Sequence, residues 1–507
     1  MKMELFQDYF NKQKTKFSLF LCKLFLICSL FLVFSCDNFG TVSKFAQDCL
    51  DDTMLVMVYV AGANTLNQEV IMDINSMEKG LFLAKQQGIS NLKVVALVDK
   101  DISVGNETWT GSRLYEIQPY NTDLSSNKIH SKVIEKASNS LGTWRTGSDD
   151  EEDMGNIQTL KNFILWASET YPFYKKQSLI LWNHGGGVYS DYKPQKNICT
   201  DLESGATSES LDNTLYIGEI KELLESLYSK ENPLEFLGMD ACFMGMYEIA
   251  YQFRNVAKYM SFSPATEWGG WNYEHIFSQI NTANSGKDFA INAVDGYKIA
   301  YDSLYPNTLT AIDLQYAQDL KNSIDKLSYT LGIEYNTDPT SLKENIEKAK
   351  QLSIFMHQKD DNKINSLLLH YPYYELGSLL RCFRNENPVL SNDLQIKFSI
   401  STASAAFEIQ TVLEKMILKT WLGGDYGDAY RESKNLKEEA LVFEKNIPYG
   451  ISIFFSNKDN FSHQGFYTNK KAGEEGVLGY GCIEAANEND NDKIDTWYEL
   501  QCALYRE

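Results

Sequence analysis

The sequence predicts an α/β fold in which helices flank a largely parallel central sheet. Two observations indicate it: short β-branched runs alternate with longer stretches of helical periodicity, and two apolar runs each end at a reactive side chain. The alternation is typical of parallel sheets, because a helix returns the chain to the same end of the sheet before the next strand. Such sheets bind ligands beyond the carboxyl ends of their strands, so the second observation also predicts where a site lies.

The alternating elements occupy the first part of the chain. We expect strands at residues 54–60, 92–98, 178–182 and 234–239, and helices at residues 67–87, 157–170 and 218–229. A β-rich insert at residues 109–117 is expected to form a hairpin. These elements predict one α/β domain over residues 54–315.

The remaining residues, 316–507, are expected to form a mostly helical subdomain with a late strand. The expected helices are 317–331, 342–356, 392–420 and 430–444, with a turn at 423–427 and a strand at 447–455. This region is expected to pack on the first domain or to gate its cleft.

The two reactive side chains are an imidazole and a thiol. The run SLILW precedes His184 and three glycines, and the run LEFLGM precedes Cys242. A cysteine attacks a carbonyl carbon as the thiolate, so it needs a histidine to take its proton. The oxyanion that follows needs backbone N–H donors, which we assign to Gly185 and Cys242, because glycine lets the main chain approach a substrate closely. The sequence therefore predicts nucleophilic catalysis by Cys242 with His184 as its base.

Each of these residues also has a purely structural interpretation. A lone histidine often caps a turn, and most cysteines are small buried hydrophobes. The occurrence of both at predicted strand ends favours catalysis over coincidence.

Several segments resemble the clostripain family of cysteine peptidases, which are relatives of caspases, legumain and gingipains. The matching segments are SLILWNHGGG around His184, LGMDACFMGMYEIAY at 237–251, and the stretches at 153–172, 263–273 and 309–314. The resemblance runs from about residue 54 to residue 314, with a weaker echo at 449–455. It implies a caspase-like sandwich and a catalytic dyad of His184 and Cys242.

The resemblance also implies a pocket for the residue before the scissile bond, the S1 pocket. The family places an acidic residue of this pocket at the aspartate of its DAC motif, here Asp240, which would pair with a substrate Arg or Lys. Members tend to carry another acid in the loop that corresponds to residues 266–271, where this chain offers only Glu267. The structural alternative is that Asp240 accepts backbone hydrogen bonds and holds the strand end in shape.

A polar loop at 188–213 separates the two motifs. Relatives are often activated by cleavage between their histidine and cysteine, after a basic residue. Lys193 and Lys196 are the only basic residues of this loop, and Lys196 is the candidate self-processing site. The alternative is an ordinary exposed loop with two lysines.

The N-terminus resembles an export signal. Three lysines precede an apolar stretch at 17–34, and Ser35 then precedes Cys36, as in a bacterial lipobox. We expect a signal at 1–35, lipidation at Cys36 and a linker at 36–53. An uncleaved membrane anchor is the alternative. Both interpretations predict an exported, membrane-anchored protein in the periplasm or on the cell surface.

Composition limits the partners. The formal charge of −21 argues against nucleic acid, and we expect a monomer acting on proteins or peptides with basic residues. The chain has no CxxC or HExxH pattern, so no metal site and no required cofactor are predicted. Calcium is left open: some clostripain relatives depend on it, and the acidic run at 149–153 could ligate it, although such runs are usually solvated loops.

Two other classes of function remain open at this point. The chain could be a catalytically inactive binding or adhesion lipoprotein on the same fold, and Asn183, where relatives often have aspartate, departs from the pattern. A hydrolase with a carboxylate pair has only scattered acids to support it. The intact motifs around His184 and Cys242 favour the peptidase, which alkylation would inactivate.

Overall fold

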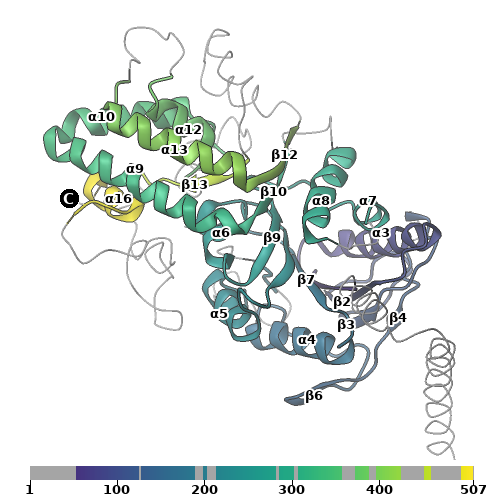
Figure 1. Cartoon of the computed structure of the whole chain (residues 1–507). Coiled ribbons are helices and arrows are strands. Elements are labelled where there is room, and N and C mark those ends of the chain that lie inside the picture. Colours follow the sequence, from purple (N-terminus) through teal and green to yellow (C-terminus); the bar gives the residue numbers. More distant parts are fainter. Residues whose placement is uncertain are drawn as a thin grey trace, which may run out of the picture. The chain divides into compact units, whose positions relative to one another are not determined.

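The centre of the structure is a mixed β-sheet (Figure 1). The computed structural model describes residues 53–124, 127–188, 198–201, 213–280, 285–301, 307–356, 372–386, 396–423, 450–457 and 493–505. Within these residues the sheet has nine strands in the order β12-β10-β9-β8-β7-β1-β2-β3-β4. The described residues from Thr53 onward cluster as one unit.

Five parallel strands form the middle of the sheet. They are β1 (Met54–Ala61), β2 (Leu92–Lys100), β7 (Lys176–Trp182), β8 (Leu234–Asp240) and β9 (Ala257–Phe262). Every residue of β1 and β8 is buried, as continuous apolar strands covered on both faces require. The four strands expected from the sequence and the largely parallel α/β sheet are confirmed.

The edges of the sheet are antiparallel. They are β3 (Gly111–Glu116) and β4 (Lys132–Val133) beyond β2, and β10 (Asn307–Asp313) and β12 (Ile417–Gly423) beyond β9. The hairpin expected at 109–117 is wrong, because this segment forms the single strand β3. Its backbone pairs with the free edge of β2 over six residues, a longer ladder than so short a segment could make with itself.

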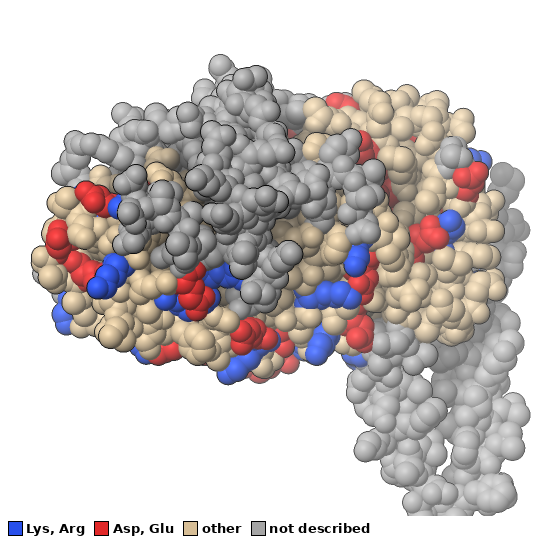
Figure 2. Space-filling model, turned by 90° about the horizontal axis from the view of Figure 1, so that it is seen from above, with Lys and Arg blue, Asp and Glu red and all other residues tan. Residues whose placement is uncertain are grey.

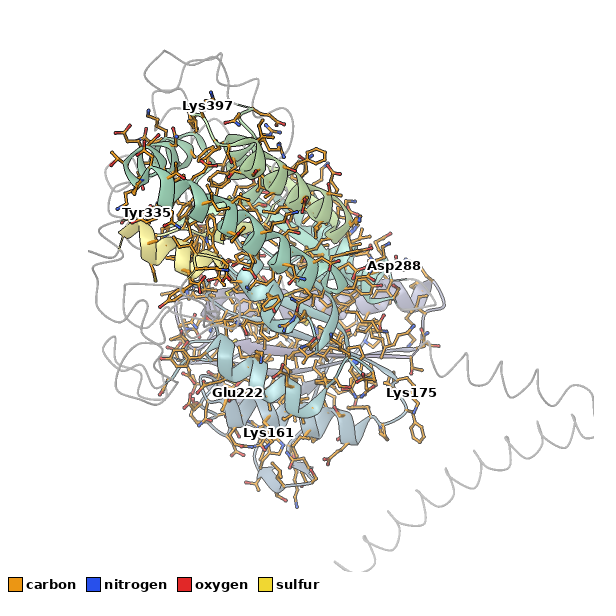
Figure 3. All side chains as sticks on the ribbon, turned by 60° about the vertical axis from the view of Figure 1, so that its left-hand side comes forward. Lys161, Lys175, Glu222, Asp288, Tyr335 and Lys397 are labelled. Atoms are coloured by element: carbon orange, nitrogen blue, oxygen red, sulfur yellow. The ribbon has the colours of Figure 1, made fainter. Side chains whose placement is uncertain are left out.

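Helices cover both faces of the sheet. One layer is α3 (Asn67–Gln86), α7 (Tyr273–Ser278) and α8 (Gly286–Tyr301), and the other begins with α4 (Ile157–Thr170), α5 (Ile217–Leu227) and α6 (Tyr247–Phe253). Successive residues of β1 face opposite layers, with Met57 in the α4 layer and Val58 in the α3 layer. Lys161 and Glu222 mark α4 and α5 in Figure 3, and Asp288 marks α8. The three helices expected in this part of the chain are confirmed.

The C-terminal part is mostly helical, as expected. It consists of the 3-10 turn η3 (Leu314–Tyr316), α9 (Ala317–Thr337), α10 (Pro339–Leu352), α12 (Leu376–Phe383), α13 (Ile400–Met416), α16 (Trp497–Tyr505) and the strand pair β11 (Tyr373–Glu375) and β13 (Ser452–Phe454). A second small strand pair, β5 (Ala137–Asn139) and β6 (Gly142–Arg145), lies apart from the main sheet. The helix α16 was not expected from the sequence.

One expected helix is partly wrong. Among the described residues of the segment predicted as a helix over 392–420, only those of α13 are helical, and from Ile417 the chain continues as β12. The residues of β12 include aromatic and β-branched side chains, which fit a strand, and hydrogen bonds fix its register on β10: Thr310 to Thr420 at 2.8 Å and the Trp421 indole to Asn307 at 2.9 Å. The expected helix at 430–444 and most of the turn at 423–427 lie outside the described residues.

The surface carries both signs of charge. Figure 2 shows acidic and basic side chains interspersed over the described part of one face. The acidic excess of the chain is therefore not gathered into one patch on that face. Among the described residues, no helix combines the length and apolar character needed to cross a membrane.

Candidate active site

The two motif-bearing strands lie side by side and end at the same edge of the sheet. Trp182, the last residue of β7, pairs with Asp240, the last residue of β8, and the Asn183 N–H donates to the Asp240 carbonyl at 3.2 Å. His184 and Cys242 each follow two residues later. The expected meeting of the two strand ends is confirmed.

The backbones that carry the imidazole and the thiol are in contact. A Cβ atom added to Gly185 would collide with the carbonyl oxygen of Cys242 and would lie 3.0 Å from the Ala241 Cβ. Glycine is therefore required here for a close approach of two chain segments. The approach brings the main chain of Gly185 against that of Cys242.

The His184 ring is held by a hydroxyl. Its Nε2 lies 2.8 Å from the Thr65 Oγ1, and burial lowers the pKa of the imidazole below its usual value. A neutral imidazole at pH 7 can accept a proton. The preceding residue, Asn183, donates to the carbonyls of Ala61 and Thr200, so the amide at this position anchors the end of β7 to its neighbours.

The Cys242 thiol is partly exposed and bonded to a neighbouring loop. Its sulfur accepts the Glu267 N–H at 3.2 Å and donates to the Glu267 carbonyl at 3.7 Å. Burial raises the pKa of the thiol to about 12. The resting side chain is therefore a thiol rather than a thiolate, and a base must remove its proton before it attacks.

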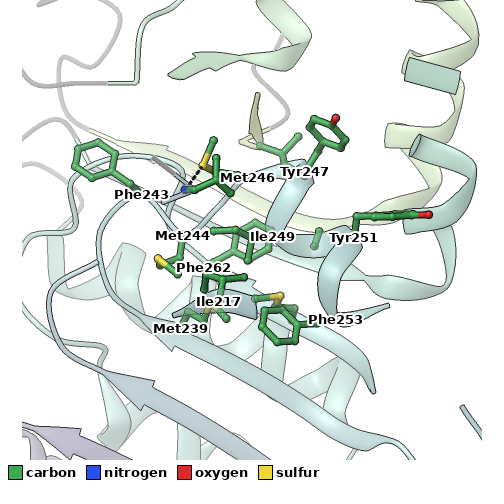
Figure 4. Packing of buried hydrophobic residues seen from close by; sticks show 14 of the residues in the cluster. Ile217, Met239, Phe243, Met244, Met246, Tyr247, Ile249, Tyr251, Phe253 and Phe262 are labelled. Atoms are coloured by element: carbon green, nitrogen blue, oxygen red, sulfur yellow. Dashed lines mark hydrogen bonds between the residues drawn. The ribbon is translucent and has the colours of Figure 1, made fainter. Parts of the chain in front are cut away.

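The chain turns sharply after the thiol. Phe243 has a φ of 61°, a left-handed conformation that is unusual for a bulky residue, and its N–H donates to the Ala265 carbonyl at 2.9 Å. The Gly245 N–H donates to Ser263 at 2.7 Å. Apolar side chains, including Met244 and Met246, pack beneath this turn (Figure 4). The turn holds Cys242 in place by packing and hydrogen bonds together.

The C-terminal part buttresses both loops of the site. The Tyr373 hydroxyl donates to the Gly186 carbonyl at 2.7 Å, and the Ser452 N–H donates to Gly245 at 2.8 Å. Gly187 has a φ of 70°, and a Cβ there would lie 2.7 Å from the Tyr373 oxygen. The strand pair β11–β13 thus supports the glycine run and the cysteine turn from one side.

Asp240 is a buried carboxylate next to the thiol. Its Oδ2 accepts the Tyr273 hydroxyl at 2.7 Å and the Trp271 N–H at 3.1 Å. Burial raises the pKa of this carboxyl to about 7, against the lowering effect of those two hydrogen bonds. Asp240 therefore accepts a backbone hydrogen bond, as the structural interpretation of this residue predicts.

Glu267, the second predicted S1 carboxylate, lies close to the first. Its Oε1 accepts the Trp271 indole N–H at 2.5 Å, so Trp271 bonds both acids. Burial, and then the charge of Asp240, raise the pKa of Glu267. The structure brings Asp240 and Glu267 together around one tryptophan.

Two predicted residues cannot be placed. Lys196 and Cys36 both lie outside the described residues.

Two residues that sequence reasoning missed, Thr65 and Asp73, reach the site from the segment after β1 and from α3. Thr65 could have been found from the pairing of β1 with β7, because residues directly after β1 then lie at the catalytic edge. Asp73 could have been found from the polar residues at the core-facing positions of α3.

Three other carboxylates could together hold a cation. Oxygen atoms of Asp99, Glu151 and Asp201 all lie within 4.8 Å of one another, and two of these residues are buried. Only Glu151 belongs to the acidic run that the sequence singled out. Carboxylate oxygens suit a hard cation such as calcium.

A parallel sheet that presents a thiol and an imidazole at adjoining strand ends defines a class, the cysteine hydrolases of α/β architecture. The clostripain family model matches residues 58–469, and the chain belongs to the clostripain family. It is a cysteine endopeptidase. The match continues well beyond residue 314, where the resemblance was expected to fade, and so includes much of the C-terminal part.

Relatives support the same assignment. The chain is 26% identical over 504 residues to clostripain from Hathewaya histolytica, covering 88% of this chain and 85% of the relative. An inactive zymogen C11 protease from Parabacteroides distasonis superposes with a TM-score of 0.52 and 17% identity over 80% of this chain and 92% of its own. A secreted C11 cysteine protease from Bacteroides thetaiotaomicron, in complex with an irreversible peptide inhibitor, superposes with a TM-score of 0.50 and 17% sequence identity. The match covers 82% of this chain and 96% of that protease. The expected caspase-like fold is confirmed.

Proposed function

We propose that this protein is an exported, lipid-anchored endopeptidase that cleaves after arginine or lysine through a dyad of His184 and Cys242. The observation that carries the proposal is the position of the buried Asp240, two residues before the thiol and beside Glu267. Buried carboxylates beside a nucleophile favour a cationic side chain in the pocket.

The reaction follows from the protonation states of the two groups. Neutral His184 takes the proton of the Cys242 thiol as the sulfur attacks the carbonyl carbon of the scissile bond. The N–H groups of Gly185 and Cys242 donate to the oxyanion of the tetrahedral intermediate. His184 then protonates the leaving amine, and water hydrolyses the thioester of the acyl-enzyme to release the second product.

A panel of fluorogenic peptides tests the proposal. The fragment from Asp37 onward and its Cys242→Ala variant are compared on peptides that end in Arg, Lys, Asp or Leu before the reporter. We expect cleavage after Arg and Lys that vanishes in the variant. Cysteine-dependent cleavage after Leu or Asp instead would remove the role given to Asp240 and Glu267, and no cleavage by a folded protein already cut in the 188–213 loop would favour an inactive binding protein.

Mass spectrometry of the purified protein tests the proposed export and processing, because both change the mass and the termini of the chain. We expect purified full-length protein to begin at a lipid-modified Cys36 and to carry a break after Lys196. Cys36→Ala should move the protein from the membrane to the soluble fraction, and Lys196→Ala should leave the chain intact. An unprocessed N-terminus would favour the uncleaved anchor, and a break that persists in Cys242→Ala protein would show that another protease makes it.

Thr65 should position the catalytic base. Thr65→Val keeps the shape but removes the hydroxyl bonded to Nε2 of His184. We expect kcat to fall about two- to tenfold, because one hydrogen bond is worth about 0.5–1.5 kcal/mol, with little change in KM. Thr65→Ser restores the hydroxyl and should restore kcat. A Thr65→Val enzyme with normal kcat would show that the bond does not orient the ring.

Calcium should stabilise the fold if Asp99, Glu151 and Asp201 hold it. Saturating calcium raises the free energy of unfolding by about 2.7 kcal/mol at 100 times its Kd, so the thermal midpoint should rise with calcium and fall with chelator. Asp201→Asn should lose this response, whereas Asp319→Asn, on the exposed side of α9, should keep it. An equal calcium response in both variants would exclude this cluster as the site.

A further inference from the structure

A third carboxylate reaches the S1 region from a helix that carries none of the peptidase motifs. Asp73 lies on α3 and is buried, and its Oδ2 accepts the Trp182 indole N–H at 2.7 Å. Trp182 is the strand partner of Asp240. A Cβ atom added to Gly270 would collide with the same Oδ2, so Asp73 occupies the space beside the loop where a side chain at residue 270 would stand.

The three carboxylates surround one short piece of chain. The Trp271 N–H donates to Asp240, the Trp271 indole donates to Glu267, and Gly270 contacts Asp73. They come from three separate elements: strand β8, the loop before α7, and helix α3. Carboxylates therefore lie on several sides of Gly270 and Trp271.

Among the described residues, no ion pair joins Asp73, Asp240 or Glu267 to a cationic side chain. The pKa of Asp73 is raised mainly by burial. The nearby carboxylates of Asp240 and Glu69 raise it further. The pKa of the Tyr301 hydroxyl is raised by burial and then by the charges of Asp73, Asp240, Glu267 and Glu69, so all four acids lie near this hydroxyl. Among the described residues, the Oε2 atoms of Glu267 and Glu69 are buried without a hydrogen-bond partner.

A buried hydrogen-bond acceptor without a partner lowers the stability of the protein. A ligand that donates a hydrogen bond to it would regain that free energy on binding. A guanidinium or ammonium supplies both N–H donors and the missing positive charge. An apolar substrate side chain would supply neither. The unmet carboxylate oxygens therefore indicate a cationic ligand.

We propose that Asp73 is a specificity-determining residue, a third carboxylate of the S1 pocket that binds the basic substrate side chain together with Asp240 and Glu267. This inference rests on the proposed function and adds to it a residue from outside the family's motifs. Relatives tend to carry a second acidic residue in the loop that corresponds to residues 266–271. In this protein Asp73 of α3 would add a carboxylate beside that loop, because Gly270 has no side chain to occupy the space.

The competing explanation is that Asp73 only anchors Trp182. Asp73→Asn separates the two roles, because the amide oxygen can still accept the indole N–H while the negative charge is removed. The matched control is Asp319→Asn, which removes the same charge from the exposed side of α9. Neither substitution changes the size of the side chain appreciably.

The experiment measures binding of benzamidine, a small amidinium, and cleavage of the Arg and Lys peptides. In Asp73→Asn we expect the inhibition constant of benzamidine and the KM of both peptides to rise about 10- to 100-fold, as loss of a hydrogen bond to a charged group implies. Alkylation of Cys242 by neutral iodoacetamide should proceed at the wild-type rate, which shows that the thiol and the fold are intact.

The outcomes separate this inference from the proposed function. If Asp73→Asn binds benzamidine as wild type does while Asp240→Asn does not, Asp73 is only an anchor and the basic specificity stands. If Asp73→Asn alkylates slowly, its role is structural. If the wild-type enzyme neither binds benzamidine nor cleaves after basic residues, the proposed specificity fails and the role of Asp73 fails with it.

The pH dependence of binding gives a second readout. The titratable groups near Asp73 are Glu69 on α3, Asp240 on β8, Glu267 in its loop, Tyr273 on α7 and Tyr301 on α8. A carboxyl must lose its proton to bind an amidinium, and the pKa of Asp240 is raised to about 7, so affinity should increase as pH rises through neutrality. The Asp73→Asn variant has one carboxyl proton fewer to release on binding. Its affinity for benzamidine should therefore rise less steeply with pH than that of the wild type. Identical slopes in the two proteins would contradict direct binding by Asp73.

Discussion

If the proposed basic specificity holds, replacing Asp240 with asparagine should lower kcat/KM for Arg and Lys peptides by about 10²- to 10³-fold. The reason is the loss of a buried partner for the substrate cation, since removing one member of a buried ion pair costs about 3–5 kcal/mol. The amide oxygen of asparagine can still accept the Tyr273 hydroxyl at the position of Oδ2, so the strand end should keep its shape. The Cys242 thiol should therefore alkylate normally.

Glu235→Gln is the matched control for this result. Glu235 is a buried carboxylate on the same strand, but it lies at the opposite end of β8 and pairs with Lys258 at 2.6 Å. Its substitution should change stability without changing the preference among substrates. If both variants lose activity equally, the effect of Asp240→Asn comes from a weakened strand rather than from the pocket, and wild-type activity in Asp240→Asn would exclude an electrostatic role.

The meeting of the two motif-bearing strand ends was predictable from local sequence pattern. His184 and Cys242 each follow a short apolar run, and parallel strands expose their carboxyl ends at one edge, so no knowledge of tertiary contacts was needed. The same logic applied to β1 would have drawn attention to Thr65, which follows that strand. It was missed because the order of the strands in the sheet is not a local property.

Asp73 shows a different limit. Read along the sequence, an aspartate in a helix is expected to face solvent, but α3 is buried nearly all round, and its buried positions include Asp73, Asn75 and Glu78. The partners of these polar groups come from distant segments, as when Glu78 accepts hydrogen bonds from Ser131 and the His130 N–H. Polar residues at the core-facing positions of a helix are the signal that such partners exist.

The errors in secondary structure have a common physical cause. Both β3 and β12 lie in the antiparallel outer parts of the central sheet. The side-chain environment of such a strand is set by its neighbours in the sheet, so local periodicity predicts its position and partner poorly. The parallel strands were predicted well because full burial gives them continuous apolar runs.

Replacing Gly185 with alanine should reduce kcat by about 100-fold with little change in KM. The added methyl group would collide with the Cys242 carbonyl and lie 3.0 Å from the Met244 side chain, so the His184 loop and the cysteine turn must move apart. A displacement of about 1 Å in a catalytic group can cost 10²-fold in rate. The strain should also lower the free energy of unfolding by about 1–3 kcal/mol, which denaturant titration measures.

Gly218→Ala is the control for adding a methyl group to this protein. Gly218 lies in the first turn of α5, and a Cβ atom there meets no other atom within 4 Å. Its substitution should leave kcat unchanged and slightly raise stability, by about 0.4–1 kcal/mol, because alanine restricts the unfolded chain. If Gly185→Ala retains wild-type kcat, the contact between the two loops does not set the geometry of attack, and the oxyanion donors assigned to Gly185 and Cys242 must be sought elsewhere on the site.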